Sequence, residues 1–440
     1  MCDTDAYNIR NKKGVEKLAR RVEKVIDNYS ERDFQALLSI YNYRCLSMNQ
    51  LFNLHYRHSK NKEVTPEYLR KKILKMKKDN LIEEVKCVGK KTPTVFFLTN
   101  DGIQAVKIYF NLSSNIYDTR KRIHERGYYT CSEVRVADRF IPHQYNLNQF
   151  ALTVGELLKY KDINYSYVDE RHVSQTYGIR PDGILSTLGL DIFLEMDMGT
   201  ESLQQLKEKW NHYRSYLNSQ SYIDNGKKIV IFFICYNKGK VNDRIKVIKN
   251  SLNEHFIDCL KEVEVYVGLP EKLMSVMKNI LIPFYTTGKN EMYDDLILGL
   301  KKHSFKVASG IQMAKYLNNT NYTFYIKNDE GKDFLVQEFF GEPIGAMNRV
   351  AFHESINASF ERKFNKTLPL LLIGTSEDII INNIDLFIIS DIPHVYFSTI
   401  KRLNELPFNE ALFKIMPDGS IYSFSKDFKN IIQTQKLSKK

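Results

Sequence analysis

The sequence predicts a multidomain protein of mixed α/β class that begins with a basic helical module. The chain has 440 residues, which is too long for a single hydrophobic core. Hydrophobic residues make up 43% of it, as in folded proteins. In its later part, apolar runs of strand length alternate with amphipathic helices, which is typical of sheets flanked by helices. We expect a module over residues 1–110, a polar connector over 111–140, and two α/β domains over 141–290 and 300–440.

Positive charge is concentrated in the N-terminal module. Residues 1–100 hold 21 Lys and Arg against 12 Asp and Glu, so they carry +9 of the chain's net charge of +12. Such a module favours a polyanionic partner, with nucleic acid as the first candidate. An ordinary basic surface is the alternative explanation for the same charge.

The cysteines and apolar runs indicate the class of protein. The six cysteines are scattered, without a Cys-x-x-Cys pair, and no His cluster has the spacing of zinc ligands. We expect reduced cysteines that pack in a cytoplasmic protein. We expect no signal peptide, and no apolar run in this sequence reaches the roughly 18 residues that a membrane span needs. A membrane partner is therefore not expected.

Three helix starts can be identified in the N-terminal module. Each is a Ser or Thr whose side chain can accept a hydrogen bond from the first turn of a helix. The predicted N-caps are Ser30, Ser47 and Thr65. Pro66 occupies the first position of the third helix, where proline is favourable. An amphipathic helix with a basic face is expected ahead of them, over residues 10–27.

A strand hairpin is expected after the third helix. Residues 81–86 and 94–98 have strand character, and the basic turn 88–93 joins them. Three helices and a basic-tipped hairpin predict a winged helix-turn-helix, whose third helix fits the major groove while the wing reaches phosphates. The predicted DNA-binding residues are Arg70, Lys71, Lys72, Lys75, Lys78, Lys90 and Lys91. A protein-docking winged helix and a merely solvated basic face remain open.

Carboxylates gather on two predicted strands of the first α/β domain. Arg180-Pro181-Asp182-Gly183 enters one strand, and residues 191–197 return as the second strand of a hairpin. Glu195 and Asp197 are two residues apart, so they point to the same face, where Asp182 could meet them. Converging carboxylates suit Mg²⁺ or Mn²⁺. A metal there can activate water and stabilise charge on a phosphate.

The helix that follows carries Lys209 and Tyr213 at a spacing of four, so the two side chains share a face. Taken in order, Arg-Pro-Asp-Gly, a strand ending Glu-x-Asp-x-Gly-Thr at residues 195–200 and a Lys-x-x-x-Tyr helix resemble the replication-relaxation family of plasmid and mobile-element proteins. The N-terminal winged helix fits that family too, and the likeness covers about residues 30–285. It implies a role in plasmid replication and DNA relaxation, and a PD-(D/E)xK nuclease-like fold for the first α/β domain.

On that resemblance, Asp182 and Glu195 are metal ligands, with Asp197 beside them. The usual lysine two residues after the Glu is missing, because Asp197 stands there. Lys209 could supply the displaced charge and Tyr213 could position a phosphate. The candidate catalytic residues are Asp182, Glu195, Lys209 and Tyr213. The absence of the strand lysine weakens the expectation of DNA cleavage. The alternative is that the acids have a structural role, in a network in which Arg180, Lys207 and Lys209 pair with them.

Residues 300–440 repeat the order of predicted elements in damaged form. Glu338 falls where Glu195 falls, but Tyr325 stands in the place of Asp182. We hypothesise a degenerate second nuclease-like domain, kept for scaffolding, dimerisation or DNA grip. The alternative is that any α/β domain alternates strands and helices in this way.

Three functions are compatible with these patterns. The first is a protein of a plasmid or mobile element that binds double-stranded DNA and nicks or processes it with a metal. The second is a non-catalytic initiator or regulator that uses both α/β domains for DNA binding and self-association, for example as a homodimer. The third is a relaxase with a tyrosine nucleophile, which is least favoured because the paired His motif of a relaxase metal site is missing.

Overall fold

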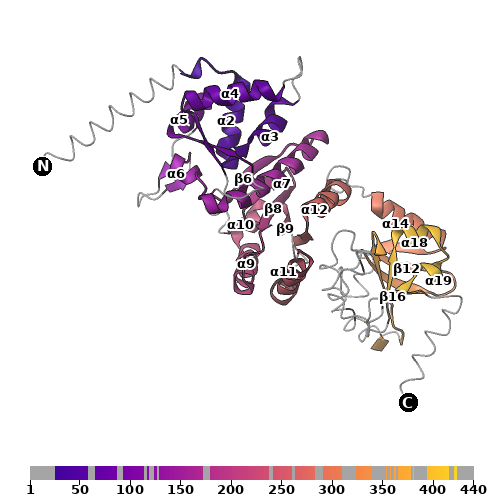
Figure 1. Ribbon diagram of the computed structural model, residues 1–440. Coiled ribbons are helices and arrows are strands. Elements are labelled where there is room, and N and C mark those ends of the chain that lie inside the picture. The colour runs from indigo at the N-terminus through magenta and orange to yellow at the C-terminus, as the bar shows by residue number, and fades with distance from the viewer. Residues whose placement is uncertain are drawn as a thin grey trace. The chain divides into compact units, whose positions relative to one another are not determined.

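The computed structural model is shown as a ribbon in Figure 1. The chain divides into two compact units, Met1–Ser186 and Thr187–Lys440. The boundary falls inside the predicted 141–290 domain, and the predicted domain limits stay predictions. The structure describes residues 25–57, 65–86, 93–112, 116–117, 123–125, 128–171, 179–236, 241–259, 263–282, 291–309, 324–338, 353, 357, 361–362, 365–377, 380, 394–415 and 421–423.

The first unit opens with a module of helices and a small sheet. Strand β3 lies at the centre of the sheet and pairs antiparallel with both β1 and β2. The elements are α2 (Glu31–Tyr43), β1 (Leu46–Ser47), α3 (Met48–Leu51), the π-helical turn η1 (Phe52–Tyr56), α4 (Pro66–Lys78), β2 (Ile82–Val85), β3 (Val95–Leu98) and α5 (Asn100–Tyr109). The predicted helix 10–27 lies mostly outside the described residues, as does most of the predicted basic turn.

The three predicted N-caps are confirmed. Ser30, Ser47 and Thr65 begin α2, α3 and α4, and each has an extended backbone. Each side-chain oxygen accepts a hydrogen bond from the backbone N–H three residues later, at 3.3 Å in α2 and α3 and at 3.4 Å in α4. Because these caps depend only on local sequence, the starts of the helices could be predicted from it.

A buried carboxylate joins the helices of the module. Asp33 on α2 has 1% of its side chain exposed and lies 2.7 Å from Lys72 Nζ of α4. Tyr56 Oη donates to its second oxygen at 3.0 Å. Burial alone would raise the pKa of Asp33, but hydrogen bonds from Lys72 and Ser30 outweigh it and hold the pKa below its ordinary value. One acid thus connects three helical segments.

The rest of the first unit consists of short elements, one long helix and a strand pair. Strands β6 and β7 pair antiparallel, with Asp169 opposite Gly183. The elements are β4 (Ile116–Tyr117), β5 (Ile123–Glu125), α6 (Cys131–Val134), the 3-10 helix η2 (Asp138–Phe140), α7 (Ile141–Tyr160), β6 (Ser166–Asp169) and β7 (Gly183–Ser186). A Cβ on Gly183 would come within 3.0 Å of the Tyr167 ring, so the glycine of the Arg-Pro-Asp-Gly motif permits this close approach.

In the second unit, the expected strand–helix alternation is confirmed. Strand β9 lies between β8 and β10 and is parallel to both. The elements are β8 (Leu190–Asp197), α9 (Leu203–Leu217), α10 (Gln220–Asn225), β9 (Lys228–Cys235), α11 (Val241–Phe256), η3 (Ile257–Cys259), β10 (Val263–Gly268), α12 (Pro270–Val276) and the π-helical turn η4 (Met277–Leu281). All eight residues of β8 are buried, so both of its faces are covered.

A second sheet follows in the same unit. Its strands run in the order β11-β12-β13-β14-β15-β16-β17, and β13, β14 and β15 are parallel neighbours. The elements are α14 (Glu291–Lys302), β11 (Lys306–Ser309), β12 (Phe324–Lys327), β13 (Asp333–Glu338), β14 (Leu370–Gly374), β15 (Val395–Thr399), α18 (Ile400–Glu405), α19 (Phe408–Ala411), β16 (Phe413–Ile415) and β17 (Ile421–Ser423). Each of the two sheets therefore contains three consecutive parallel strands. Within the part of the chain that the structure describes, no helix has the length and apolar character to cross a bilayer.

We predict that Lys72→Ala lowers the free energy of unfolding of the N-terminal module by about 3 kcal/mol, because it leaves the buried Asp33 carboxylate without its cation. Urea denaturation followed by circular dichroism measures the change. Lys71→Ala is the matched control, since Lys71 is the exposed neighbour on the same helix, and it should change the free energy by less than about 0.5 kcal/mol. Equal effects of the two substitutions would show that the Asp33–Lys72 pair does not hold the module together.

Candidate functional site

Glu195 near the end of β8 is the centre of a polar cluster in the second unit. Its side chain is 1% exposed, and Lys209 Nζ lies 2.7 Å from Oε2. Tyr213 Oη donates to Oε1 at 2.5 Å. The structure thus brings together three of the four candidate catalytic residues, and Lys209 and Tyr213 reach the acid from adjacent turns of α9.

Helix α9 is positioned by its cap and by an apolar face. Ser202 and Gln205 form a capping box at its start. Trp210 is fully buried and packs on Phe233 of β9, with 5.5 Å between the ring centroids. Phe233 is the register partner of Glu195, so the same packing sets the helix over the acid. The polar residues of α9 therefore meet Glu195 because its apolar residues fix the rotation of the helix.

Lys209 contacts more than Glu195. Its Nζ also lies 2.8 Å from Glu201 Oε1, in the loop before α9. The ammonium group sits 5.1 Å from the centre of the Phe233 ring as well, within the range of a cation–π contact. Lys209 therefore bridges two carboxylates over an aromatic ring, and 21% of its side chain remains exposed.

Asp197 is held by a residue that sequence reasoning did not single out. Arg244 of α11 donates from Nε to Asp197 Oδ2 at 2.7 Å and from Nη2 to Oδ1 at 3.0 Å. Gly199 N donates to Oδ1 at 3.1 Å. The hydrogen bonds to Asp197 raise the pKa of Arg244 further above its ordinary value. One signal was present in the sequence, because Arg244 precedes the buried Ile248 and Leu252 at helical spacing and so lies on the inward stripe.

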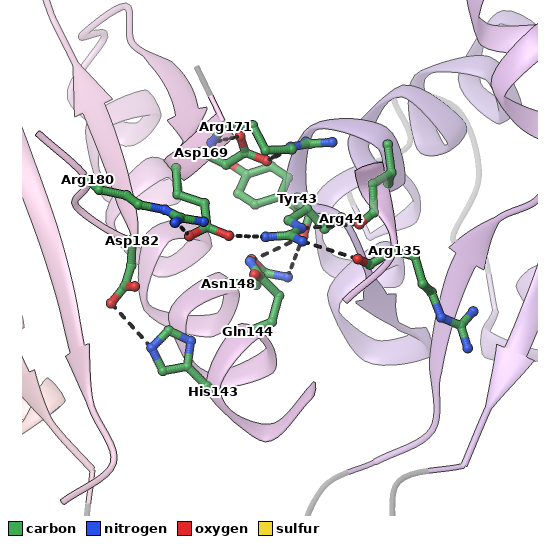
Figure 2. Close-up of polar contacts among 12 residues, drawn as sticks. Tyr43, Arg44, Arg135, His143, Gln144, Asn148, Asp169, Arg171, Arg180 and Asp182 are labelled. Carbon is green, nitrogen blue, oxygen red and sulfur yellow. Dashed lines mark hydrogen bonds and ion pairs between the residues drawn. The ribbon is translucent and has the colours of Figure 1, made fainter. Parts of the chain in front are cut away.

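Asp182 lies in the first unit, directly before β7. Its Oδ2 is 3.3 Å from His143 Nε2 of α7, and 22% of its side chain is exposed. Figure 2 shows these two side chains facing one another. Arg180 of the same motif is largely exposed, and its Nε lies 3.3 Å from Glu170 Oε2 at the end of β6.

Glu170 also connects the Asp182 region to the helical module. Arg44, at the end of α2, pairs with Glu170 Oε1 and donates to the carbonyl oxygens of Val134 and Arg135, at 3.2 Å each. Asn148 of α7 is fully buried and donates to the carbonyl oxygen at the end of α2, that of Tyr43, at 3.0 Å. Figure 2 shows these contacts between the end of α2 and α7. The module is therefore joined to α7 by a buried amide group and to the end of β6 by a charged pair.

The predicted metal site fits the structure only in part. Among the described residues, no three His, Cys, Asp or Glu side chains come together in a group that could hold a metal ion. Arg244 engages both oxygens of Asp197, so Asp197 does not fit the role of a ligand. Asp182 belongs to the first unit and Glu195 to the second. Their convergence stays a prediction.

The predicted DNA-binding residues of α4 differ in their surroundings. Arg70, Lys71 and Lys78 are exposed. Lys72 turns toward Asp33. Lys75 is exposed as well, but its Nζ donates to the carbonyl oxygen of Asn28 at 2.9 Å. Lys90 and Lys91 lie outside the described residues.

The second sheet places a different set of groups around Glu338, the last residue of β13. Tyr293 of α14 donates to Glu338 Oε1, and Gln337 Nε2 donates to Oε2 at 2.6 Å. Tyr325, which the repeat hypothesis aligns with Asp182, donates to Asp333 Oδ2 at 3.2 Å. Burial, together with the charge of Asp333, raises the pKa of Tyr325 to about 12, so its hydroxyl stays protonated. Glu338 thus has a tyrosine partner, as Glu195 does, but from the preceding helix.

One comparison with known proteins gives a match. Residues 37–231 match the family model described as replication-relaxation. The matched segment begins inside α2 and ends inside β9, so it contains Asp182, Glu195, Lys209 and Tyr213, while Arg244 lies beyond it. No curated protein and no solved structure gives a significant match.

We predict that Arg244→Ala lowers the free energy of unfolding by about 3 kcal/mol or more, because it leaves Asp197 buried and unpaired. Arg244→Lys keeps the charge but loses one of two hydrogen bonds, so a smaller loss of about 1 kcal/mol is expected. Denaturant titration monitored by the fluorescence of Trp210 reports on this core directly. Asn250→Ala, at an exposed position of α11, is the control. A loss no larger than that of the control would mean that the Asp197–Arg244 pair is not important for stability.

Proposed function

We propose that the chain binds double-stranded DNA in the replication or relaxation of a plasmid or other mobile element. The match of residues 37–231 to the family model described as replication-relaxation supports this proposal. The observation that carries this proposal is the exposed basic face of α4. Arg70, Lys71 and Lys78 all lie on it. No acidic residue occurs between Tyr68 and Lys78, so nothing within that stretch offsets the charge. Nucleic acid phosphates are the natural counterpart of such a face.

We propose that this module is a winged helix-turn-helix with α4 as its recognition helix. In support, α2, α3 and α4 are followed by β2 and β3, and β3 lies between β1 and β2. The ion pair between Lys72 and Asp33 ties α4 to α2. Such a helix can enter a major groove without losing the contacts that orient it. A protein-docking role for the same module remains the alternative.

The α/β part of the chain is proposed to hold and position DNA rather than to recognise it. The occurrence of three parallel strands in both sheets supports a second, nuclease-like domain that lacks a counterpart of Asp182. Its proposed role is scaffolding, DNA grip or self-association, including the homodimer predicted from the sequence. Light scattering of the purified chain measures that association directly.

Metal-dependent nicking is the second candidate function. The observation in its favour is the cluster of Glu195, Lys209 and Tyr213, which combines an acid, a cation and a hydroxyl at the end of a buried strand. The observation against a three-carboxylate metal site is the bidentate contact of Arg244 with Asp197. We therefore place DNA binding first and nicking second.

If α4 binds DNA, Lys71→Ala combined with Lys78→Ala should weaken the affinity for duplex DNA. The negative slope of log K against log salt should become shallower by about 2, because each lost phosphate contact reduces its magnitude by roughly 1. Fluorescence anisotropy at several salt concentrations measures both quantities. The control removes two exposed lysines elsewhere, with Lys278→Ala and Lys301→Ala. If the control lowers the slope as much, net charge rather than α4 explains binding.

Nicking by the Glu195 cluster predicts that the wild type converts supercoiled plasmid DNA carrying the element's origin to the relaxed form only with Mg²⁺ or Mn²⁺. Glu195→Gln and Asp182→Asn should abolish this conversion and keep the gel shift. Agarose electrophoresis separates the products. Nicking that survives both substitutions would exclude this site, and a covalent adduct between DNA and a tyrosine would indicate the relaxase instead. Binding without nicking by the wild type would leave the non-catalytic function.

A further inference from the structure

Leu74 is an apolar residue in the middle of the exposed basic face of α4. It is 63% exposed. Arg70 and Lys71 precede it by four and three residues, and Lys78 follows it by four. Residues at these spacings are neighbours on the surface of a helix. We propose that Leu74 contacts the 5-methyl groups of thymine in the major groove, and that the chain therefore prefers target sites with thymine at these positions. This inference rests on the proposed function, in which α4 binds duplex DNA.

The core of the module makes no use of Leu74. The buried stripe of α4 consists of Leu69, Ile73 and Met76, which are between 1% and 4% exposed. Leu74 follows Ile73, and one residue corresponds to a rotation of about 100° around a helix, so its side chain points away from that stripe. A single exposed leucine is common on protein surfaces and carries no inference alone. The charges around it are what distinguish this one.

The cations of α4 fall into two sets. Lys72, Lys75 and Lys77 bind groups of the protein itself, namely Asp33, the carbonyl oxygen of Asn28 and Glu84. The exposed Arg70, Lys71 and Lys78 surround Leu74. A polyanion attracted to this second set would bring its surface onto the leucine. Charge complementarity thus selects DNA as the partner, rather than an apolar protein surface.

The chemistry of the major groove offers leucine one good contact. Arginine and lysine pair with the acceptors of guanine or with phosphates, whereas an aliphatic side chain can only pack against an apolar group. The thymine 5-methyl is the apolar group that base pairs present there. The contacts of Lys72 with Asp33 and of Lys75 with Asn28 hold the middle of α4 in place, so Leu74 would meet the groove in a fixed register.

The test replaces thymine by deoxyuridine, which keeps the base pair and removes only the methyl group. A duplex is first selected for binding to the full-length wild type from a randomised pool. Its thymines are then replaced one at a time, and affinities are measured by fluorescence anisotropy. For the wild type, we expect about fourfold weaker binding at one or more positions, which corresponds to one buried methyl group. Leu74→Ala should bind the thymine duplex more weakly and show no difference between thymine and deoxyuridine.

Leu298→Ala is the matched control, because Leu298 is a similarly exposed leucine on α14, at 62%. It should keep the wild-type ratio between the two duplexes. The inference is overturned if deoxyuridine is neutral at every position for the wild type, or if Leu74→Ala keeps the wild-type ratio. Either result leaves DNA binding by the basic face intact. If the wild type binds no duplex at all, the proposed function itself fails and the inference fails with it, whereas binding without any sequence preference overturns the inference alone.

Discussion

A buried, ionised carboxylate needs a cationic partner, and this requirement determines how elements pack in both units of the chain. An ionised group that is buried without a partner costs several kcal/mol, so folding must bring a cation next to each such acid. Asp33 forms an ion pair with Lys72, Glu195 with Lys209, and Asp197 with Arg244. In each case the acid and the cation belong to different elements. The pairing therefore fixes how a helix docks, as well as neutralising a charge.

For the candidate site, the acids of the motif can therefore be interpreted in two ways, as metal ligands or as structural ion-pair partners. Glu195 and Asp197 are the carboxylates that a metal would use, and they are also the groups that attach α9 and α11 to β8. Asp197 is engaged at both oxygens, and Lys209, which contacts Glu195, is shared with Glu201. The predicted structural network and the predicted nuclease site thus consist largely of the same side chains. Lys209 is common to both, which explains why the sequence pattern alone could not separate them.

How far the sequence could predict the structure depends on how local each feature is. The N-caps of α2, α3 and α4 need only a Ser or Thr and the following turn, and they were predicted correctly. The meeting of Lys209 and Tyr213 with Glu195 also followed, because strand alternation and helical spacing define faces. The contact between Arg244 and Asp197 could not be placed, because it depends on how α11 packs on the sheet. Lys72 was grouped with the exposed lysines, although it follows Leu69 by three residues and precedes Met76 by four, and so lies beside the buried stripe.

Some cations of α4 bind groups of the protein itself, and others are exposed. This difference changes how the basic charge of the first hundred residues is interpreted. A cation that already binds a carboxylate or a carbonyl releases few counterions when DNA arrives, so it adds little to the salt-dependent part of affinity. Lys72 and Lys77 pair with acids, and Lys75 donates to a carbonyl oxygen, whereas Arg70, Lys71 and Lys78 remain exposed. The electrostatic contribution of α4 is then that of a few side chains, well below what the net charge suggests. If α4 binds DNA as proposed, so few phosphate contacts would require a further source of affinity, and the proposed contact of Leu74 with thymine would supply one that also distinguishes between bases.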